Sequence, residues 1–307
     1  MHSLKPANLS DSSDTIALAS LSAACFGLSI VITKSILPTD AGTYPLVLLT
    51  LQSAFGVVFL WGLVLCCRLR VPMTIDALKA GATGLLEPGL SSIFGIFGLT
   101  LTTASNAALI NTIEPILTIA LAAWLLRERI NRSLFSLTGI ACIGVGFIAF
   151  PDLYGQSSFI GDGLVVIAVS CAALYAVATR PLANQFHSLI LAALQQTFAL
   201  IWFLIVLIVV SHITTIDWTG LSLSTIALAA LSGILGYGVA FWLYLLALRR
   251  QTASVTSIYL TLIPVFSVTF AYLFLGERLT PIQGFGGALI LFVVFGISKL
   301  PLVGSSK

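Results

Sequence analysis

The feature that most constrains this sequence is a series of long segments without charge. No Asp, Glu, Lys or Arg occurs within residues 41–67, 88–113, 133–151, 163–179, 181–216, 218–248, 251–276 or 279–298. A helix needs about 20 apolar residues to cross the hydrocarbon core of a bilayer. Charged residues form 8% of the 307 residues and apolar residues form 58%, whereas soluble domains carry about 25% charged residues. The sequence therefore indicates a polytopic membrane protein. It excludes a soluble multi-domain enzyme, a disordered chain, a nucleic-acid binder and a disulfide-stapled secreted domain.

Turn residues and charges divide the chain into ten candidate spans. They lie near residues 14–36, 44–67, 75–101, 104–126, 132–150, 160–181, 188–211, 223–248, 251–275 and 279–299. A transmembrane barrel would need strands in which polar and apolar residues alternate. Runs such as Leu200–Val210 do not alternate, so we predict an all-α integral membrane protein with ten transmembrane helices.

The basic residues predict the orientation. If the N-terminus is cytoplasmic, two basic residues, Lys34 and Arg278, fall outside. The inner side then receives twelve: Lys5, Arg68, Arg70, Lys79, Arg127, Arg129, Arg132, Arg180, Arg249, Arg250, Lys299 and Lys307. Because cytoplasmic loops are enriched in Lys and Arg, we expect residues 1–13 and 300–307 to be cytoplasmic tails. The short loops suit a plasma membrane, specifically a bacterial inner membrane.

Two segments of the chain read alike. Residues 103–130 and 252–279 both open with Thr-Ala-Ser, share a proline at positions 115 and 264, and end in Glu-Arg, all with one offset of 149. The chain then divides into two five-span repeats, residues 14–150 and 160–299. Because five is odd, the second repeat must enter the membrane inverted. Inverted repeats are characteristic of secondary transporters, whose substrate site lies at the repeat interface.

These paired segments resemble the drug/metabolite transporter superfamily, specifically ten-span proteins with two EamA-type repeats. Leu275-Gly276-Glu277-Arg278 closes the ninth span and Gly161-Asp162 opens the second repeat. The first copy, Leu126-Arg127-Glu128-Arg129, departs from this ending because it lacks the glycine. The resemblance covers nearly the whole chain. It implies export or uptake of small, often amphipathic metabolites, often linked to protons, and leans toward efflux.

Two acidic residues lie well inside the predicted spans, Glu87 and Glu114. A charge at the centre of a spanning helix costs about 2.5–3.5 kcal/mol on insertion scales, so such residues face the bundle interior or a cavity. Each is followed by a proline, Pro88 or Pro115, which kinks a helix and frees a carbonyl. On a helical wheel Asn111 and Thr118 share the face of Glu114. We therefore predict a substrate or proton site on this face; an interhelical hydrogen-bond clamp is the alternative.

The remaining candidates are less specific. Pro264 follows an isoleucine instead of an acid, so the site should carry its negative charge on the first repeat, which favours a cationic or zwitterionic substrate. Gln52, Gln195, Tyr237 and Tyr259 are candidate cavity residues, although a glutamine in a span commonly bridges helices. Lys34 and Arg180 end the first and sixth spans as gate residues or as snorkelling anchors.

The leading hypothesis is a secondary transporter that exports a small amino-acid-like or other amphipathic solute by alternating access, with proton coupling as one option. A membrane-embedded enzyme and a non-transport sensor or scaffold are the alternatives. The three histidines, His2, His187 and His212, are scattered, and no metal-ligand spacing or P-loop occurs. We expect no catalysis, no metal and no cofactor. The expected partners are a small-molecule substrate, membrane lipid and protons, without nucleic acid; substrate identity and a homo-oligomer stay open.

Overall fold

The computed structural model describes residues 9–37, 44–72, 74–102, 107, 110–128, 132–149, 158–216, 221–276, 278 and 280–298. Within these residues all regular structure is helical and no strand occurs. The helices are α1 (Leu9–Ile36), α2 (Tyr44–Cys66), α3 (Ile75–Ala82), α4 (Ser91–Leu101), α6 (Glu114–Leu125), α7 (Arg132–Ala149), α8 (Phe159–Gln185), α9 (Ser188–Ile213), α10 (Leu223–Gly233), α11 (Phe241–Arg250), α12 (Ala253–Leu260), α13 (Leu262–Leu275) and α14 (Pro281–Ser298). The 3₁₀ turn η1 (Thr83–Leu85) and the π-helical segments η2 (Leu86–Leu90) and η4 (Ile234–Ala240) lie between them.

The ten predicted spans correspond to these helices. Seven continuous or composite helices of the described chain are long and apolar enough to cross a membrane. The three shorter apolar helices, α6, α7 and α14, occupy the places of the fourth, fifth and tenth spans. The all-helical, ten-span prediction is confirmed. The first part of the fourth predicted span, residues 103–106 and 108–109, lies outside the described residues.

The first apolar span is Asp14–Ile36, as predicted, and it lies inside a helix that begins at Leu9. One boundary differs from the expectation. Helix α8 continues to Gln185 and contains Pro181 in its interior. Arg180 therefore lies within the last turns of α8 and does not end it.

Four spans are interrupted where a continuous helix would otherwise cross the membrane. Glu87 has an extended backbone (φ −140°, ψ 122°) between α3 and α4, and η4 interrupts the eighth span. A turn at residues 112–113 interrupts the helix of the fourth span, and a turn at Thr261 interrupts that of the ninth. Residues 112 and 261 are 149 positions apart, so the two breaks are equivalent in the repeats. The prolines then lie in the first turns of α6 and α13, where the missing N–H has no helical partner to lose.

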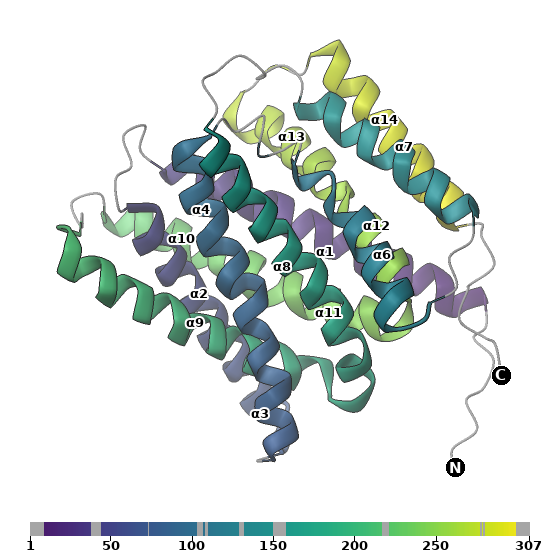
Figure 1. The fold of residues 1–307 in the computed structure, drawn as a ribbon. Coiled ribbons are helices and arrows are strands. Elements are labelled where there is room, and N and C mark those ends of the chain that lie inside the picture. The colour runs from purple at the N-terminus through teal and green to yellow at the C-terminus, as the bar shows by residue number, and fades with distance from the viewer. Residues whose placement is uncertain are drawn as a thin grey trace.

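The two repeats are interleaved. Helix α1 packs against α13, and α8 packs against α6, so each repeat contributes one member of an equivalent pair. Helix α2 packs against α9, and Figure 1 shows α7 lying along α14 at one edge of the bundle. The contact of α1 with α13 is therefore repeated by that of α8 with α6, with the roles of the two halves exchanged. This arrangement is what an inverted repeat predicts, and it places the repeat interface in the centre of the bundle.

The outside of the bundle is apolar. Large hydrophobic side chains are exposed on several helices, including Trp124 (76%), Phe159 (92%) and Ile213 (80%). Buried polar side chains occur inside instead, among them Gln52, Gln195 and several threonines. An exterior of this kind is suited to lipid, and an interior with polar groups is typical of helices that hydrogen-bond to one another in a membrane.

Candidate functional site

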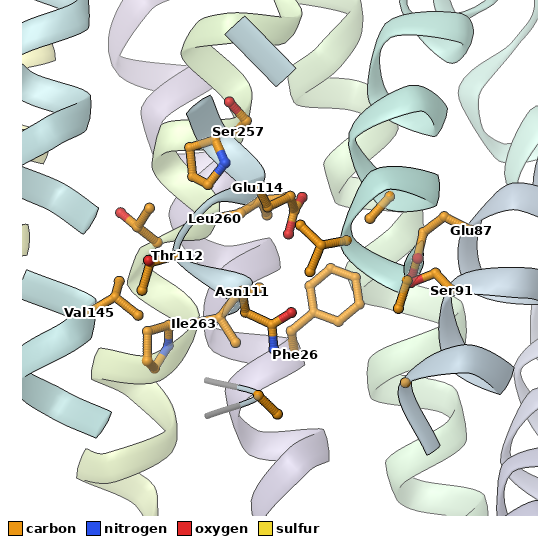
Figure 2. Close-up of a pocket in the computed structure, with 18 of the residues that line it drawn as sticks. Phe26, Glu87, Ser91, Asn111, Thr112, Glu114, Val145, Ser257, Leu260 and Ile263 are labelled. Carbon is orange, nitrogen blue, oxygen red and sulfur yellow. The ribbon is translucent and has the colours of Figure 1, made fainter. Parts of the chain in front are cut away.

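A cavity of about 700 Å³ lies between the two repeats. Its walls come from α1, α4, α6 and α7 of the first repeat and from α8, α11, α12 and α13 of the second. Both Glu87 and Glu114 line it, as do Asn111, Pro115 and Pro264. The breaks at Glu87, at residues 112–113 and at Thr261 all lie at the wall of the cavity and bring these residues together. Figure 2 shows Glu87 and Glu114 reaching this region from different helices.

Glu87 is the residue at which the third span loses helical geometry. Ser91, one turn further along, interacts electrostatically with its carboxylate and also lines the cavity. The Glu87 oxygen Oε2 is enclosed and has no hydrogen-bond partner among the described residues. A buried polar atom without a hydrogen-bond partner is costly. A solute or proton bound to this oxygen would remove that cost.

Glu114 is the first residue of α6, directly after the turn at residues 112–113. The Cys142 thiol of α7 donates a hydrogen bond of 2.9 Å to the Thr112 carbonyl and so ties this turn to the neighbouring helix. Within the described chain no hydrogen bond or ion pair is found for the Glu114 carboxyl, and it interacts electrostatically with Glu87. The two acids therefore both contribute negative charge to the same region of the cavity.

Aromatic rings form one wall of the cavity. Phe26, Tyr175, Phe241 and Tyr244 all line it. Phe26 packs edge-to-face on Phe241, with ring centroids 5.2 Å apart. Tyr175 stacks on Tyr244 at 6.1 Å and meets Phe241 edge-on at 6.3 Å. Such contacts fix ring positions, since offset and edge-to-face pairs are the favoured geometries. Most other lining residues are small or aliphatic.

The rest of the described chain offers no alternative chemical centre. No group of three or more His, Cys, Asp and Glu side chains could hold a metal among the described residues. His187 is the N-cap of α9, where its Nδ1 accepts a hydrogen bond from the Leu189 amide. His212 lies at the opposite end of the same helix, exposed.

Comparison with known proteins identifies this arrangement. The model of the EamA-like transporter family matches residues 14–150 and again residues 159–299. The chain belongs to the EamA-like transporter family. It is thus a member of the drug/metabolite transporter superfamily, and it is a multi-pass membrane transporter.

Several relatives carry transporter names. A "Probable amino-acid metabolite efflux pump" of Salmonella typhimurium is 29% identical over 73% of this chain and 76% of that protein. A "Probable terminal-alkyne amino-acid exporter" of Streptantibioticus cattleyicolor is 27% identical over 65% of each chain, so the match spans just under two thirds of that relative. A solved crystal structure superposes with a TM-score of 0.78 over 94% of this chain and 96% of its own, at 17% identity, which shows a shared fold.

In this EamA-like transporter the two predicted glutamines lie outside the cavity lining. Gln52 donates hydrogen bonds to Thr33 (2.8 Å) and Ser232 (3.0 Å), and Ser29 also bonds to Ser232 (2.9 Å). We call these four residues the Gln52 cluster. They join α1 and α2 of the first repeat to α10 of the second.

Gln195 forms an equivalent cluster on the other side. It donates to Thr83 (2.7 Å) and Thr179 (3.3 Å), and its Oε1 accepts a bond of 2.9 Å from Tyr175. We call these four residues the Gln195 cluster. Ser232 and Thr83 are 149 positions apart, so the two clusters are repeat equivalents. They differ because only the Gln195 cluster includes a cavity-lining residue, Tyr175.

Four other candidates also lie away from the cavity. Thr118 is fully buried in α6 and its hydroxyl has no described partner. Tyr259 packs in an apolar cluster with Ile119 and Ala19. Tyr237 stacks on Phe241 behind the cavity wall (6.4 Å), and Pro88 is buried beside Glu87. These side chains are absent from the described cavity lining.

The predicted gate residues occupy different surroundings. Lys34 lies in the last turn of α1 and is exposed. Arg180 is half-buried and interacts electrostatically with Glu128. Glu128 itself accepts hydrogen bonds from the backbone amides of Ala253 (3.0 Å) and Ser254 (3.3 Å), and from the Ser254 hydroxyl. Its repeat equivalent, Glu277, lies outside the described residues.

Sequence reasoning missed three residues of the aromatic wall, and it missed Ser91. Phe26, Phe241 and Tyr244 are three of many aromatic residues in the spans, and no repeat partner distinguishes them. Ser91 follows Glu87 by four residues, the spacing at which helical side chains meet, so this signal was present.

Proposed function

We propose that this protein is a secondary transporter that exports a small amine-bearing, amino-acid-like metabolite by alternating access, with Glu114 as the central binding or proton-carrying group. The main support for the proposal is the cavity at the repeat interface. Both intramembrane carboxyl groups line it, beside two equivalent helix breaks. In inverted-repeat transporters the substrate site lies at this interface, beside discontinuous helices. The names of the Salmonella and Streptantibioticus relatives support export of amino-acid metabolites.

The shape of the cavity supports one state of an alternating-access cycle. At one end the lining residues Tyr175, Tyr244 and Ser257 are almost fully buried. Beyond that end Glu128 fastens the fourth span to the start of α12. With the N-terminus in the cytoplasm, as the basic residues predict, this closed end faces the cytoplasm. The structure then corresponds to an outward-facing state, and export requires the Glu128 contacts to open.

Proton coupling is assigned to Glu114. An ionisable group inside a membrane is functional by default, and Glu114 has no described hydrogen-bond partner to neutralise it. A carboxyl group that releases its proton to the cytoplasm, binds the substrate amine there, and exchanges it for a proton at the outer face would couple the two movements. Glu87 is the second member of this pair, because its charge acts directly on Glu114.

The test is comparative metabolomics of spent medium and cell extracts. Cells would express wild type, Glu114→Gln, or Asp76→Asn at matched membrane levels, beside an empty vector. Asp76 is an exposed carboxylate in the first turn of α3, so it controls for the loss of an acid outside the cavity. We expect an amine-bearing compound to be enriched outside cells with wild type and Asp76→Asn, and not with Glu114→Gln. Equal export by Glu114→Gln, with unchanged pH dependence, would remove Glu114 from the mechanism.

A further inference from the structure

We propose that the cavity selects organic cations, meaning amines with an apolar body and without a free carboxylate, over zwitterionic amino acids and over anions. This inference rests on the proposed transport function. It narrows the amine-bearing, amino-acid-like class to members whose carboxyl group is absent or blocked as an ester or amide. It follows from the charges, the neutral donors and the aromatic rings that line the cavity.

The charges on the cavity wall have one sign. Glu87 and Glu114 line it, and no Lys, Arg or His does so among the described residues. The neighbouring undescribed positions, 103–106 and 108–109, contain no basic residue in the sequence either. A substrate carboxylate would therefore be removed from water without a cation to pair with, which is costly. The two acids of the cavity would also repel a substrate carboxylate, whereas they would accept hydrogen bonds from an ammonium group.

The neutral hydrogen-bonding groups compensate for this only in part. The Asn111 amide also lines the cavity and can donate to a carboxylate, but it supplies no positive charge. The Ser257 hydroxyl already donates to the Ser254 carbonyl (3.0 Å) and the Thr261 hydroxyl to the Ile258 carbonyl (2.6 Å). The Tyr175 hydroxyl is bonded to Gln195. Ser267, whose hydroxyl has no described partner, is a neutral donor of this wall. It suits the carbonyl oxygen of an ester or amide, which needs one hydrogen bond and no counter-charge.

The enclosed oxygen of Glu87 gives the cation a specific acceptor. Glu87 lines the cavity, and its Oε2 is enclosed and unpartnered within the described chain. A rotation of the Glu87 side chain that turned this oxygen to the cavity would let an ammonium donor satisfy it, and charge-assisted hydrogen bonds are about twice as strong as neutral ones. A carboxylate or a neutral ether would leave it unpaired.

The aromatic wall suits the same ligand. A cation held over the face of a Phe or Tyr ring is attracted by the electrons of that face, more strongly when water is excluded. Phe241 contacts both Phe26 and Tyr175, so the rings form one surface beside the carboxyl groups. This surface can contact the ammonium group and cover the apolar body of the ligand. A cavity of about 700 Å³ lies in the range that encloses small organic ligands.

The test compares three probes with one phenyl body and different charges: 2-phenylethylamine, L-phenylalanine and 3-phenylpropionate. Binding to the purified full-length protein in nanodiscs would be measured by calorimetry at neutral pH. We expect the amine to bind at least about 10-fold more tightly than phenylalanine, and phenylpropionate not to bind, since an unpaired buried charge costs more than one factor of ten. Equal or tighter binding of phenylalanine overturns the proposal, as does the absence of binding by all three probes.

Variants separate the two parts of the site. Glu114→Gln and Glu87→Gln should each weaken amine binding at least about 10-fold, with Asp76→Asn as the control. Phe241→Leu keeps an apolar side chain and should weaken it about 5-fold through loss of the ring face. Monodisperse elution on size exclusion would show that each variant is folded. An unchanged amine affinity in the Glu87→Gln/Glu114→Gln double variant overturns the proposal.

Flux in proteoliposomes distinguishes this inference from the function on which it rests. Amine binding without saturable amine flux would overturn the proposed transport and leave the charge selectivity standing. Saturable flux of phenylalanine, with phenylalanine bound more tightly than the amine, would keep the transport function and overturn the selectivity.

Discussion

Single glycines set how closely the two repeats approach. A Cβ added at Gly84 would lie 2.0 Å from the Gln195 carbonyl oxygen, and one at Gly233 would lie 2.2 Å from that of Gln52. We therefore expect Gly84→Ala and Gly233→Ala each to lower stability by about 1–3 kcal/mol or more, since backbone atoms cannot yield easily. Thermal unfolding in detergent, followed by size exclusion, measures this. Gly139→Ala is the control, because nothing lies within 4 Å of its added Cβ; equal loss there would contradict the explanation.

At the same scale, the sequence predicted some of the site and missed the rest for a physical reason. Glu87, Glu114 and Asn111 could be found because a charge or amide is conspicuous in an apolar span. Tyr237 and Tyr259 were predicted from their mid-span positions, but depth along a helix does not say which side of it faces a cavity. Phe26 and Phe241 could not be found, because an aromatic ring that faces lipid and one that faces substrate are alike in sequence.

At the scale of helices, one carboxylate connects two spans of different repeats. Glu128 accepts three hydrogen bonds from Ala253 and Ser254 at the start of α12. Glu128→Ala leaves these donors unpaired, so we expect a loss of about 2 kcal/mol, the upper part of the range for N-cap removal. Glu128→Gln keeps one acceptor oxygen, so its stability should lie between those of Glu128→Ala and wild type. Melting temperatures in nanodiscs would rank the three proteins; an Ala variant as stable as wild type would show that the contact is not stabilising.

The helix breaks show what repeat analysis can predict about elements. The shared prolines at positions 115 and 264 lie in the first turns of α6 and α13, so new helices begin beside them where a kink was expected. The π-helical segment η4 has no proline. Its sequence signal is a pair of glycines, Gly236 and Gly238, which weaken a helix without marking where it changes geometry. The ten spans were predictable because length and hydropathy determine them. The π-helical segments depend on packing between repeats and were not.

For the whole molecule, the distribution of basic residues predicts both termini in the cytoplasm. A fusion of green fluorescent protein to the C-terminus should therefore fluoresce, and a fusion of alkaline phosphatase at the same position should be inactive. Moving the phosphatase to the predicted outer loop at residues 151–158 should restore its activity. An active C-terminal phosphatase with a silent loop fusion would reverse the orientation and, with it, the assignment of the closed end of the cavity to the cytoplasm.

The two polar clusters extend the pseudo-two-fold relation to the interior of the whole molecule, and only one of them reaches the cavity wall. Gln52→Met and Gln195→Met keep side-chain volume but leave buried hydroxyls unpaired, so each should lower stability by about 1–3 kcal/mol, and by similar amounts. Only the Gln195 cluster holds a residue of the cavity wall, since Tyr175 donates to Gln195. Gln195→Met should therefore also change the affinity for 2-phenylethylamine, whereas Gln52→Met should not. Paired melting and calorimetry on the two variants test this. Equal affinity changes in both would mean that the clusters act on the cavity through the repeat interface as a whole, instead of through Tyr175.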